Sequence, residues 1–238
     1  MGKYIIAGIK VGMQTHDGKL RRQAMEYLKD FEGEPEVKIA LSEDFILKKQ
    51  QENPHLSFES CEYIWSCFDF CRRLIDFDGF MIHASAVVYE DKAYVFSAPS
   101  GTGKSTHTAL WQKVFGEDKT YIINDDKPAI RVRGEEIVVC GTPWSGKTDK
   151  NKNAEVPLGG ICFLERGENN EIDEMSPKTA IYKILNQTLR PFGEENMIKL
   201  LDLINRVLLN SKVYEMKCNM DEDAAIVAYE KMSGRKKR

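Results

Sequence analysis

Two segments of this chain match the phosphate-loop pattern G-x-x-x-x-G-K-[ST], in which a glycine-rich turn joins a β-strand to the N-terminus of an α-helix. Residues 98–105 read Ala-Pro-Ser-Gly-Thr-Gly-Lys-Ser, with Ala98 in place of the first glycine. Residues 141–148 read Gly-Thr-Pro-Trp-Ser-Gly-Lys-Thr and satisfy the pattern in full. Since a phosphate loop works only between a strand and a helix N-terminus, the flanking sequence decides which segment can bind a nucleotide.

The first segment has the required neighbours. Residues 93–97 form a short, β-prone apolar run, and residues 106–115 carry apolar side chains at helical spacing before Gly116. We therefore expect backbone N–H groups to point at a polyphosphate, Lys104 to reach its β- and γ-phosphates and Ser105 to hold Mg²⁺. Ala98 fits if its backbone φ is not positive. The predicted nucleotide-binding residues are Ser100, Gly101, Thr102, Gly103, Lys104, Ser105 and Thr106.

The second segment lacks the helix. Residues 137–140 are a plausible strand, but residues 149–153 read Asp-Lys-Asn-Lys-Asn and have no apolar periodicity. We interpret residues 141–153 as a flexible loop that closes over the site, with Lys147 as a candidate positive charge at the γ-phosphate. Arg190 is another candidate for that charge, although a surface cation is its simpler interpretation.

An acidic pair follows the next strand. Asp125 and Asp126 come directly after residues 121–123, about twenty residues beyond Lys104, at the end of a strand where sites of α/β sheets gather. One carboxylate could bind Mg²⁺ and the other could accept the proton of a hydroxyl group. The alternative is a solvated Asx turn before Lys127 and Pro128.

The pattern of expected elements predicts an α/β protein with a mixed sheet. Strands are expected at 4–13, 80–89 and 212–218, helices at 19–31, 57–75 and 194–209, and hairpins surround the strand before the first phosphate loop. We divide the chain into an N-terminal extension, 1–78, packed on a nucleotide-binding core, 79–238. Its 238 residues suit one large domain or a domain with an extension.

Composition restricts the class of protein. The net charge of −3 argues against a general nucleic-acid binder. The six cysteines show no C-x-x-C and no zinc spacing, which predicts free thiols in a reduced, cytoplasmic protein. No signal peptide and no apolar run of about 18 residues is visible, so we expect no membrane partner.

The order of motifs resembles a known family. The order is His83, a hairpin, the turn Ser-Gly-Thr-Gly-Lys-Ser, a helix and then Asn-Asp-Asp. This order resembles that of HPr kinase/phosphorylase and its relatives. It is more distantly similar to that of ATP-dependent phosphoenolpyruvate carboxykinase. A strand histidine alone is more typical of a packed core residue. The resemblance implies that His83 orients or charge-balances the two aspartates, and that the sheet has the type of the HPr kinase C-terminal domain.

The resemblance covers residues 79–133 and extends weakly to about 166. Two further segments are similar to the sequences of a short HPr-kinase-related subgroup. They are Trp-Ser-Gly-Lys at 144–147 and Pro-Leu at 157–158. Some members of this subgroup act in peptide-modification clusters. Thr106 stands where HPr kinases carry an acidic residue, and their C-terminal glycine-rich, basic signature is missing. Neither HPr as acceptor nor the reverse phosphorylase activity is therefore expected.

The sequence thus predicts a kinase that uses ATP and Mg²⁺ to phosphorylate a hydroxyl group. The metal ligands would be Ser105 with Asp125 or Asp126, and the catalytic residues Asp125, Asp126, His83 and Lys147. The acceptor is a serine of a peptide or protein, free serine or another small hydroxyl compound, and the oligomeric state is left open. The alternative is a nucleotide-binding regulatory or scaffold protein without phosphoryl transfer.

Overall fold

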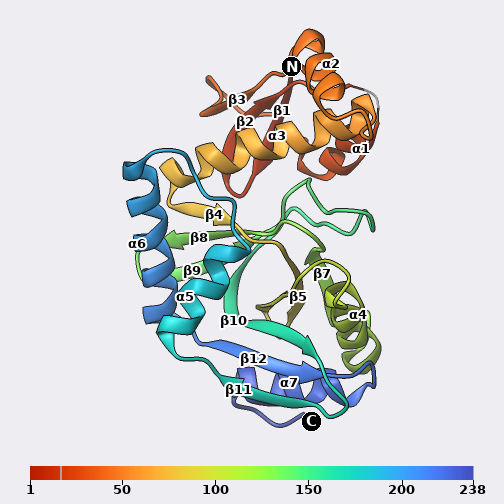
Figure 1. Ribbon diagram of the computed structural model, residues 1–238, viewed down its shortest axis with the longest axis vertical. Coiled ribbons are helices and arrows are strands. Elements are labelled where there is room, and N and C mark those ends of the chain that lie inside the picture. Colours follow the sequence, from red (N-terminus) through yellow and green to blue (C-terminus); the bar gives the residue numbers. More distant parts are fainter. Residues whose placement is uncertain (17, 238) are drawn as a thin grey trace.

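The computed structural model describes residues 1–16 and 18–237. Its N-terminal elements form a small sheet in the order β1-β2-β3, accompanied by three helices (Figure 1). The segment 4–13 is a hairpin and not the single strand that we expected, because Ala7 and Gly8 both take positive φ in the turn. The elements are β1 Gly2–Ile6, β2 Ile9–Met13, α1 Lys19–Ala24, β3 Val37–Ile39, α2 Glu43–Glu52 and α3 Phe58–Leu74.

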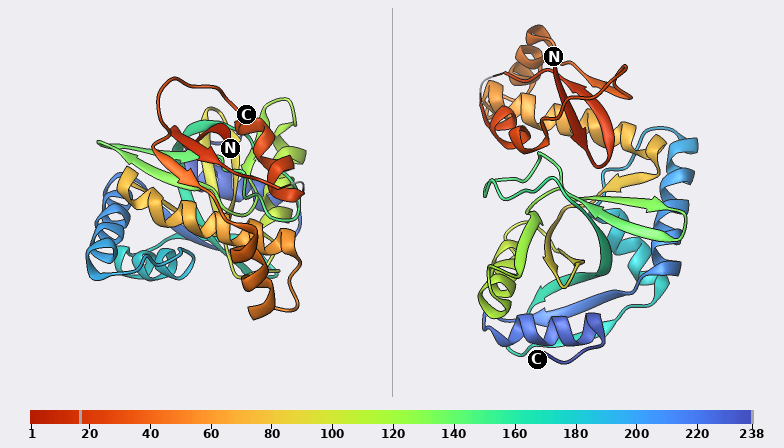
Figure 2. Two further views of the ribbon diagram at one scale, coloured as in Figure 1. Left: turned by 90° about the horizontal axis from the view of Figure 1, so that it is seen from above. Right: turned by 180° about the vertical axis from the view of Figure 1, so that it is seen from behind.

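The larger sheet of the described chain is mixed and has nine strands. Its path runs β4-β8-β9-β10-β6-β5-β7, while β12 pairs with β10 and β11 pairs with β12. Parallel pairing is confined to β6, β10 and β12, and the sheet curls in all views (Figures 1 and 2). Its strands are β4 Gly79–Met81, β5 Ala84–Tyr89, β6 Lys92–Ser97, β7 Thr120–Asn124, β8 Ala129–Arg133, β9 Glu136–Cys140, β10 Glu155–Arg166, β11 Glu171–Glu174 and β12 Val213–Cys218.

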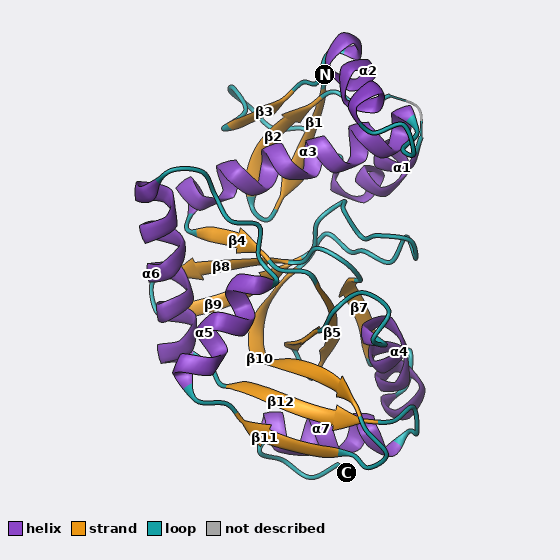
Figure 3. Ribbon diagram, viewed as in Figure 1, coloured by secondary structure: helices purple, strands orange, loops and turns teal. Residues whose placement is uncertain are grey.

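Helices α4 to α7 pack against this sheet (Figure 3). Helices α4 (Lys104–Phe115) and α7 (Asp223–Ser233) enclose an aromatic core that includes Trp111. Helices α5 (Pro177–Asn186) and α6 (Glu194–Asn210) bury their apolar faces on the aliphatic core of the other side. Burial of these faces is the main stabilising contribution, at roughly 25 cal/mol per Å² of apolar surface.

The N-terminal elements and the larger sheet share a third core. Phe70 of α3 packs with Met81 of β4, Val138 of β9 and Trp144 of the loop that follows β9. This loop rises from the sheet toward α1 and α3 (Figures 1 and 2). The boundary between extension and core at residues 78 and 79 stays a prediction.

Other expectations need correction. The strand expected over 80–89 is interrupted at residues 82 and 83, where the chain passes from β4 to β5. The helix expected over 19–31 ends at Ala24, followed by a 3₁₀ turn, Met25–Tyr27. Strand β11 was not anticipated, because its polar sequence Glu-Ile-Asp-Glu has a single apolar residue. No helix in residues 1–16 and 18–237 combines the length and apolar character needed to cross a bilayer.

Candidate nucleotide and phosphoryl-transfer site

The turn between β6 and α4 joins a strand to a helix N-terminus, which is the context that a phosphate loop requires. Gly101 and Gly103 take φ values of 79° and 118°, which favour glycine, whereas Ala98 has no positive φ. The departure from the pattern at Ala98 is therefore tolerated, as expected. A Cβ atom built on Gly101 or Gly103 would meet no protein atom within 4 Å. Both glycines thus border open space at the N-terminus of α4, where free N–H groups favour an anion.

The side chain of Lys104 lies within this turn. Its Nζ donates a hydrogen bond of 2.9 Å to the carbonyl of Ala98, and the residue is 8% exposed. Burial lowers the pKa of Lys104, while the negative charges of Asp126 and Asp125 oppose that shift. The ammonium group thus lies inside the turn, where the backbone carbonyls of Ala98 and Pro99 accept its hydrogen bonds.

The other predicted nucleotide residues surround this position. Ser100, Ser105 and Thr106 are exposed, and Thr102 is half-buried. Arg166, at the end of β10, donates a hydrogen bond of 2.8 Å to the carbonyl of Gly101. That contact ties the turn to the neighbouring parallel strand.

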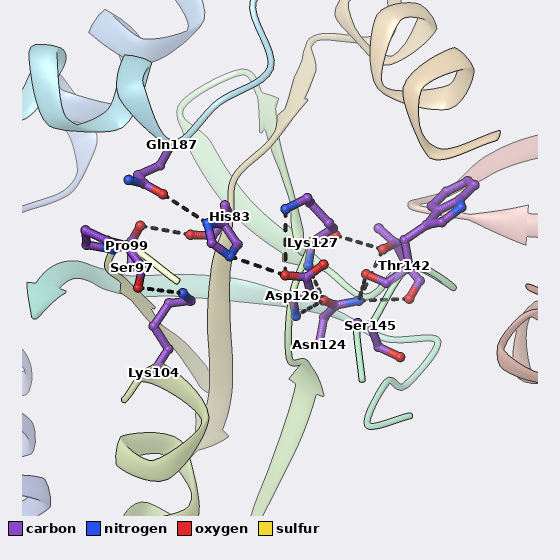
Figure 4. A network of polar contacts seen from close by, with 12 residues as sticks. His83, Ser97, Pro99, Lys104, Asn124, Asp126, Lys127, Thr142, Ser145 and Gln187 are labelled. Carbon is purple, nitrogen blue, oxygen red and sulfur yellow. Dashed lines mark hydrogen bonds and ion pairs between the residues drawn. The ribbon is translucent and has the colours of Figure 1, made fainter. Parts of the chain in front are cut away.

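Asp126, just after β7, and His83, just before β5, face each other at the same end of these two paired strands (Figure 4). His83 Nε2 lies 3.4 Å from Asp126 Oδ1, and Lys127 Nζ lies 3.7 Å from the same oxygen. Burial opposes ionisation of Asp126, but the hydrogen bond from His83 and the charges of Lys127, His83 and Lys104 outweigh it and lower its pKa. Asp126 is therefore an accessible carboxylate within a cluster of cations.

Gln187, just after α5, fixes the orientation of His83 (Figure 4). The ring Nδ1 lies 3.1 Å from Gln187 Oε1, and the backbone N–H of His83 donates to the carbonyl of Gln187 at 2.8 Å. Because a side-chain carbonyl only accepts, Nδ1 carries a proton in this arrangement. The other ring nitrogen is left to face Asp126.

Asp125 has different surroundings, which the sequence did not predict. It is 6% exposed, and its two oxygens accept hydrogen bonds from Ser85 Oγ at 2.5 Å and from Thr148 Oγ1 at 2.7 Å. Ser85 Oγ also lies 2.8 Å from Thr108 Oγ1 of α4. A buried polar chain thus links α4, β5, the acidic pair and the second pattern match.

The Asx turn that we considered as an alternative is present at Asn124, but it is buried. Asn124 Oδ1 accepts from the backbone N–H groups of Asp126 and Lys127, and its amide donates to Thr142 at 2.8 Å (Figure 4). This turn fixes the backbone that carries both carboxylates.

The second pattern match is a loop without a helix, as predicted, but it is packed rather than loosely exposed. Trp144 is fully buried, stacks on Phe70 at a centroid distance of 5.1 Å and donates to Ser66 Oγ. A Cβ atom on Gly146 would lie 2.8 Å from the Cβ of Asp126. The second glycine of this match therefore allows close packing against the acidic pair and cannot cradle a phosphate.

Lys147 is exposed, and within the described chain its ammonium group has no ion-pair partner. The structure does not join it to the cluster around Asp126. Arg190 bonds only to Asn186 among its described hydrogen bonds, at 3.0 Å, in keeping with a surface cation.

Two cavities adjoin the phosphate loop and the acidic pair. One, of about 500 Å³, lies over the carboxyl ends of β6 and β10, between Pro99, Arg166 and Tyr182. The other, of about 420 Å³, lies between α3, His83 and Asp126. Gln187 lines both, so the two cavities meet beside the phosphate loop.

The donor set suits Mg²⁺ bound largely through phosphate and water. Among the described residues, no group of three or more His, Cys, Asp or Glu side chains could hold a metal alone. Mg²⁺ needs only one or two protein oxygens when it also binds a nucleotide. Ser105 could supply a hydroxyl and Asp125 a carboxylate, and hydrogen bonds through Thr108 and Ser85 connect the two residues.

Several site residues were not expected from the sequence. Thr148 is the final Ser/Thr position of the second pattern match, so the pattern itself could have identified it as a candidate site residue. Ser85 follows His83 by two residues, so the strand expected over 80–89 would have put both side chains on one face. For Gln187, Arg166 and Tyr182 we find no sequence signal.

Comparison with protein-family models finds no match, and comparison with curated protein sequences finds none either. Among solved structures, the chain is similar to an Hpr(Ser) kinase/phosphatase from Coxiella burnetii. The match covers 54% of this chain and 96% of that one, with 13% sequence identity and a TM-score of 0.31. At this TM-score the likeness is partial, so function must be inferred from the residues of the site.

Proposed function

We propose that this protein is an ATP- and Mg²⁺-dependent kinase that transfers the γ-phosphate to a hydroxyl group. One relationship carries the proposal: β5 pairs antiparallel with both β6, which leads into the turn of Lys104, and β7, which leads to Asp126, so that this turn and the His83–Asp126 pair lie at the same edge of the sheet. The proposed phosphate-binding turn would thus lie next to the carboxylate of Asp126, which His83 orients. Phosphoryl transfer requires mainly such positioning and the neutralisation of charge on the phosphates.

The cavity over β6 and β10 suits the nucleoside. It borders Pro99 and Thr102 of the phosphate loop and lies at the carboxyl ends of two parallel strands, where ligands of α/β sheets bind. The ring of Tyr182 is available to stack on a base because the residue is 67% exposed. The triphosphate would then run along the turn to Lys104.

Asp126 is the better candidate for the base, and Asp125 for the metal ligand. Asp126 lines the second cavity, from which an acceptor can approach. Both oxygens of Asp125 are held by hydroxyl donors and keep further lone pairs. Mg²⁺, bound by Ser105 and Asp125, would neutralise charge on the phosphates.

The transfer balances without another reactant. The acceptor oxygen forms a bond to the γ-phosphorus while the bond from that phosphorus to the β–γ bridging oxygen breaks, and ADP leaves. The hydroxyl proton passes to Asp126, whose lowered pKa keeps it ionised and ready to accept. His83, held by Gln187, orients Asp126 and offsets its charge.

Slow ATP hydrolysis by the purified protein tests the proposal without knowledge of the acceptor, since water can replace the hydroxyl group. We expect Mg²⁺-dependent ADP formation that Asp126→Asn lowers on the order of 10²–10⁴-fold without loss of ATP affinity. Asp118→Asn, at an exposed position outside the site, should leave the rate unchanged. ATP binding without ADP formation, with or without a panel of hydroxyl compounds and serine-containing peptides, would favour the scaffold function instead.

A further inference from the structure

The cavity of about 420 Å³ beside Asp126 has an apolar wall supplied by α3. Ile64, Cys67, Phe68 and Cys71 lie at positions i, i+3, i+4 and i+7, so they share one face of the helix. Met81 of β4 is a further apolar contact and is buried. The volume lies within the range of small-molecule sites, roughly 300–1,000 Å³.

The body of this cavity carries no charge. Burial raises the pKa of the Cys71 thiol to about 11 and also raises that of Cys67, so both remain neutral thiols at physiological pH. The ionisable side chains among the other described lining residues are His83, Asp126 and Lys127, all at one end, and Tyr63, whose pKa is raised by burial. A charged ligand group placed among the α3 side chains would lose its hydration and find no partner.

The charged end is also the reactive end. Asp126, the proposed base, and His83 line the cavity together. Gln187 lines it where it meets the other cavity, while the exposed side chains of Ile64 and Leu189 lie at its mouth. A molecule that fills the cavity would therefore present one end to Asp126 and contact α3 with the rest.

We propose that this cavity binds the apolar part of the phosphoryl acceptor, so that the acceptor is a neutral molecule whose hydroxyl group lies next to an aromatic or aliphatic group. Such a group can belong to a small alcohol or to an apolar residue beside a serine in a peptide. The inference rests on the proposed kinase function for the role of the hydroxyl group, but the binding site itself can be tested without it.

Binding is measured first, in the absence of ATP, by ligand-observed NMR titration. The probes are 2-phenylethanol, N-acetyl-Ser-Phe-amide, N-acetyl-Ser-Gly-amide and free serine. We expect the two aromatic probes to bind at least tenfold more tightly than the other two. A preference for the dipeptide over 2-phenylethanol would identify a peptide as the source of the apolar group, and the reverse would identify a small alcohol.

Variants then locate the binding. Ile64→Asp, which puts a carboxylate at the mouth of the cavity, and Cys67→Trp, which fills it, should each weaken 2-phenylethanol binding at least tenfold. Leu201→Asp is the matched control, because Leu201 is exposed to a similar extent (41% against 44%) but lies in α6, outside the cavity. Ile64→Asp tests the proposal even if Cys67→Trp does not fold.

The outcomes separate this inference from the kinase proposal. No binding of the aromatic probes, equal binding of free serine, or equal binding in Ile64→Asp and Leu201→Asp would overturn the assignment of the cavity, even if ATP is hydrolysed. Binding that Ile64→Asp abolishes, in a protein that forms no ADP, would support the cavity and contradict the kinase.

Discussion

Thr148 Oγ1 donates a hydrogen bond of 2.7 Å to Asp125 Oδ2. The hydroxyl residue of one phosphate-loop match thereby holds the carboxylate that would serve the other match. Asp125 is buried, so its two oxygens need hydrogen-bond donors of this kind. The loop of residues 141–153, between β9 and β10, therefore holds the acidic pair in place and is not a second nucleotide site. We call it the clamp loop.

Replacement of Thr148 by valine should destabilise the protein. The variant removes a hydroxyl donor to a buried carboxylate, which costs about 1–3 kcal/mol in the free energy of unfolding. Thr148→Ser keeps the hydroxyl group and should retain most of that stability. Urea denaturation of both variants measures the difference, and equal free energies for valine and serine would show that the hydrogen bond contributes nothing.

The sequence predicted the strand, the turn and the helix around residues 98–105, and the structure has all three, because these are local features with strong signals. Phosphate binding by this turn stays a prediction. The sequence also brought His83 and Asp126 into the same candidate site, through the family resemblance. The sequence could not separate the roles of Asp125 and Asp126, because the two residues are identical and adjacent. They differ only in the side chains that contact them in the folded structure. Ser85 and Thr148 hold one, whereas His83 and Lys127 face the other.

The packed state of residues 141–153 was also beyond the sequence. Its polar stretch 149–153 indicated mobility, but Trp144 anchors the loop through a stacking contact with Phe70, seventy-odd residues earlier in the chain. The two cavities likewise depend on elements distant in sequence. Tertiary packing of this kind has no local signature.

Lys104→Ala should weaken ATP binding, whereas Lys147→Ala should not. Lys104 lies in the turn before α4, and a charge-assisted hydrogen bond contributes about 1.5–3 kcal/mol, or roughly a ten- to hundredfold change in affinity. Lys147 is exposed on the clamp loop and serves as the matched lysine control. Isothermal titration of both variants decides between the loops, and the reverse pattern would move the nucleotide to residues 141–148.

Tyr182→Ala should raise the dissociation constant of ATP more than that of inorganic triphosphate. The proposed stacking of the base on Tyr182 involves the nucleoside only, and aromatic stacking contributes roughly 0.5–1.5 kcal/mol. Phe192→Ala is the control, since Phe192 is exposed to nearly the same extent, 66% against 67%, and does not line that cavity. If both ligands weaken equally, Tyr182 does not contact the base.

Acid should destabilise the helix that carries Lys104, through His107. Trp111 Nε1 donates to His107 Nε2 at 3.3 Å, so Nδ1 bears the proton, and within the described chain Nδ1 has no hydrogen-bond partner. Burial lowers the pKa of His107 to about 3, so the folded protein keeps the ring neutral while the unfolded chain gains a proton below about pH 6.5. The unfolded state then binds more protons, and stability falls as the pH falls from 6.5 toward 3, by about 2 kcal/mol between pH 7 and pH 5.

His107→Phe removes this titration, so its unfolding free energy should fall less over the same interval, whatever its stability at pH 7. Denaturation curves at pH 7, 6 and 5 measure both proteins, and parallel losses would show that His107 is not buried in its neutral form.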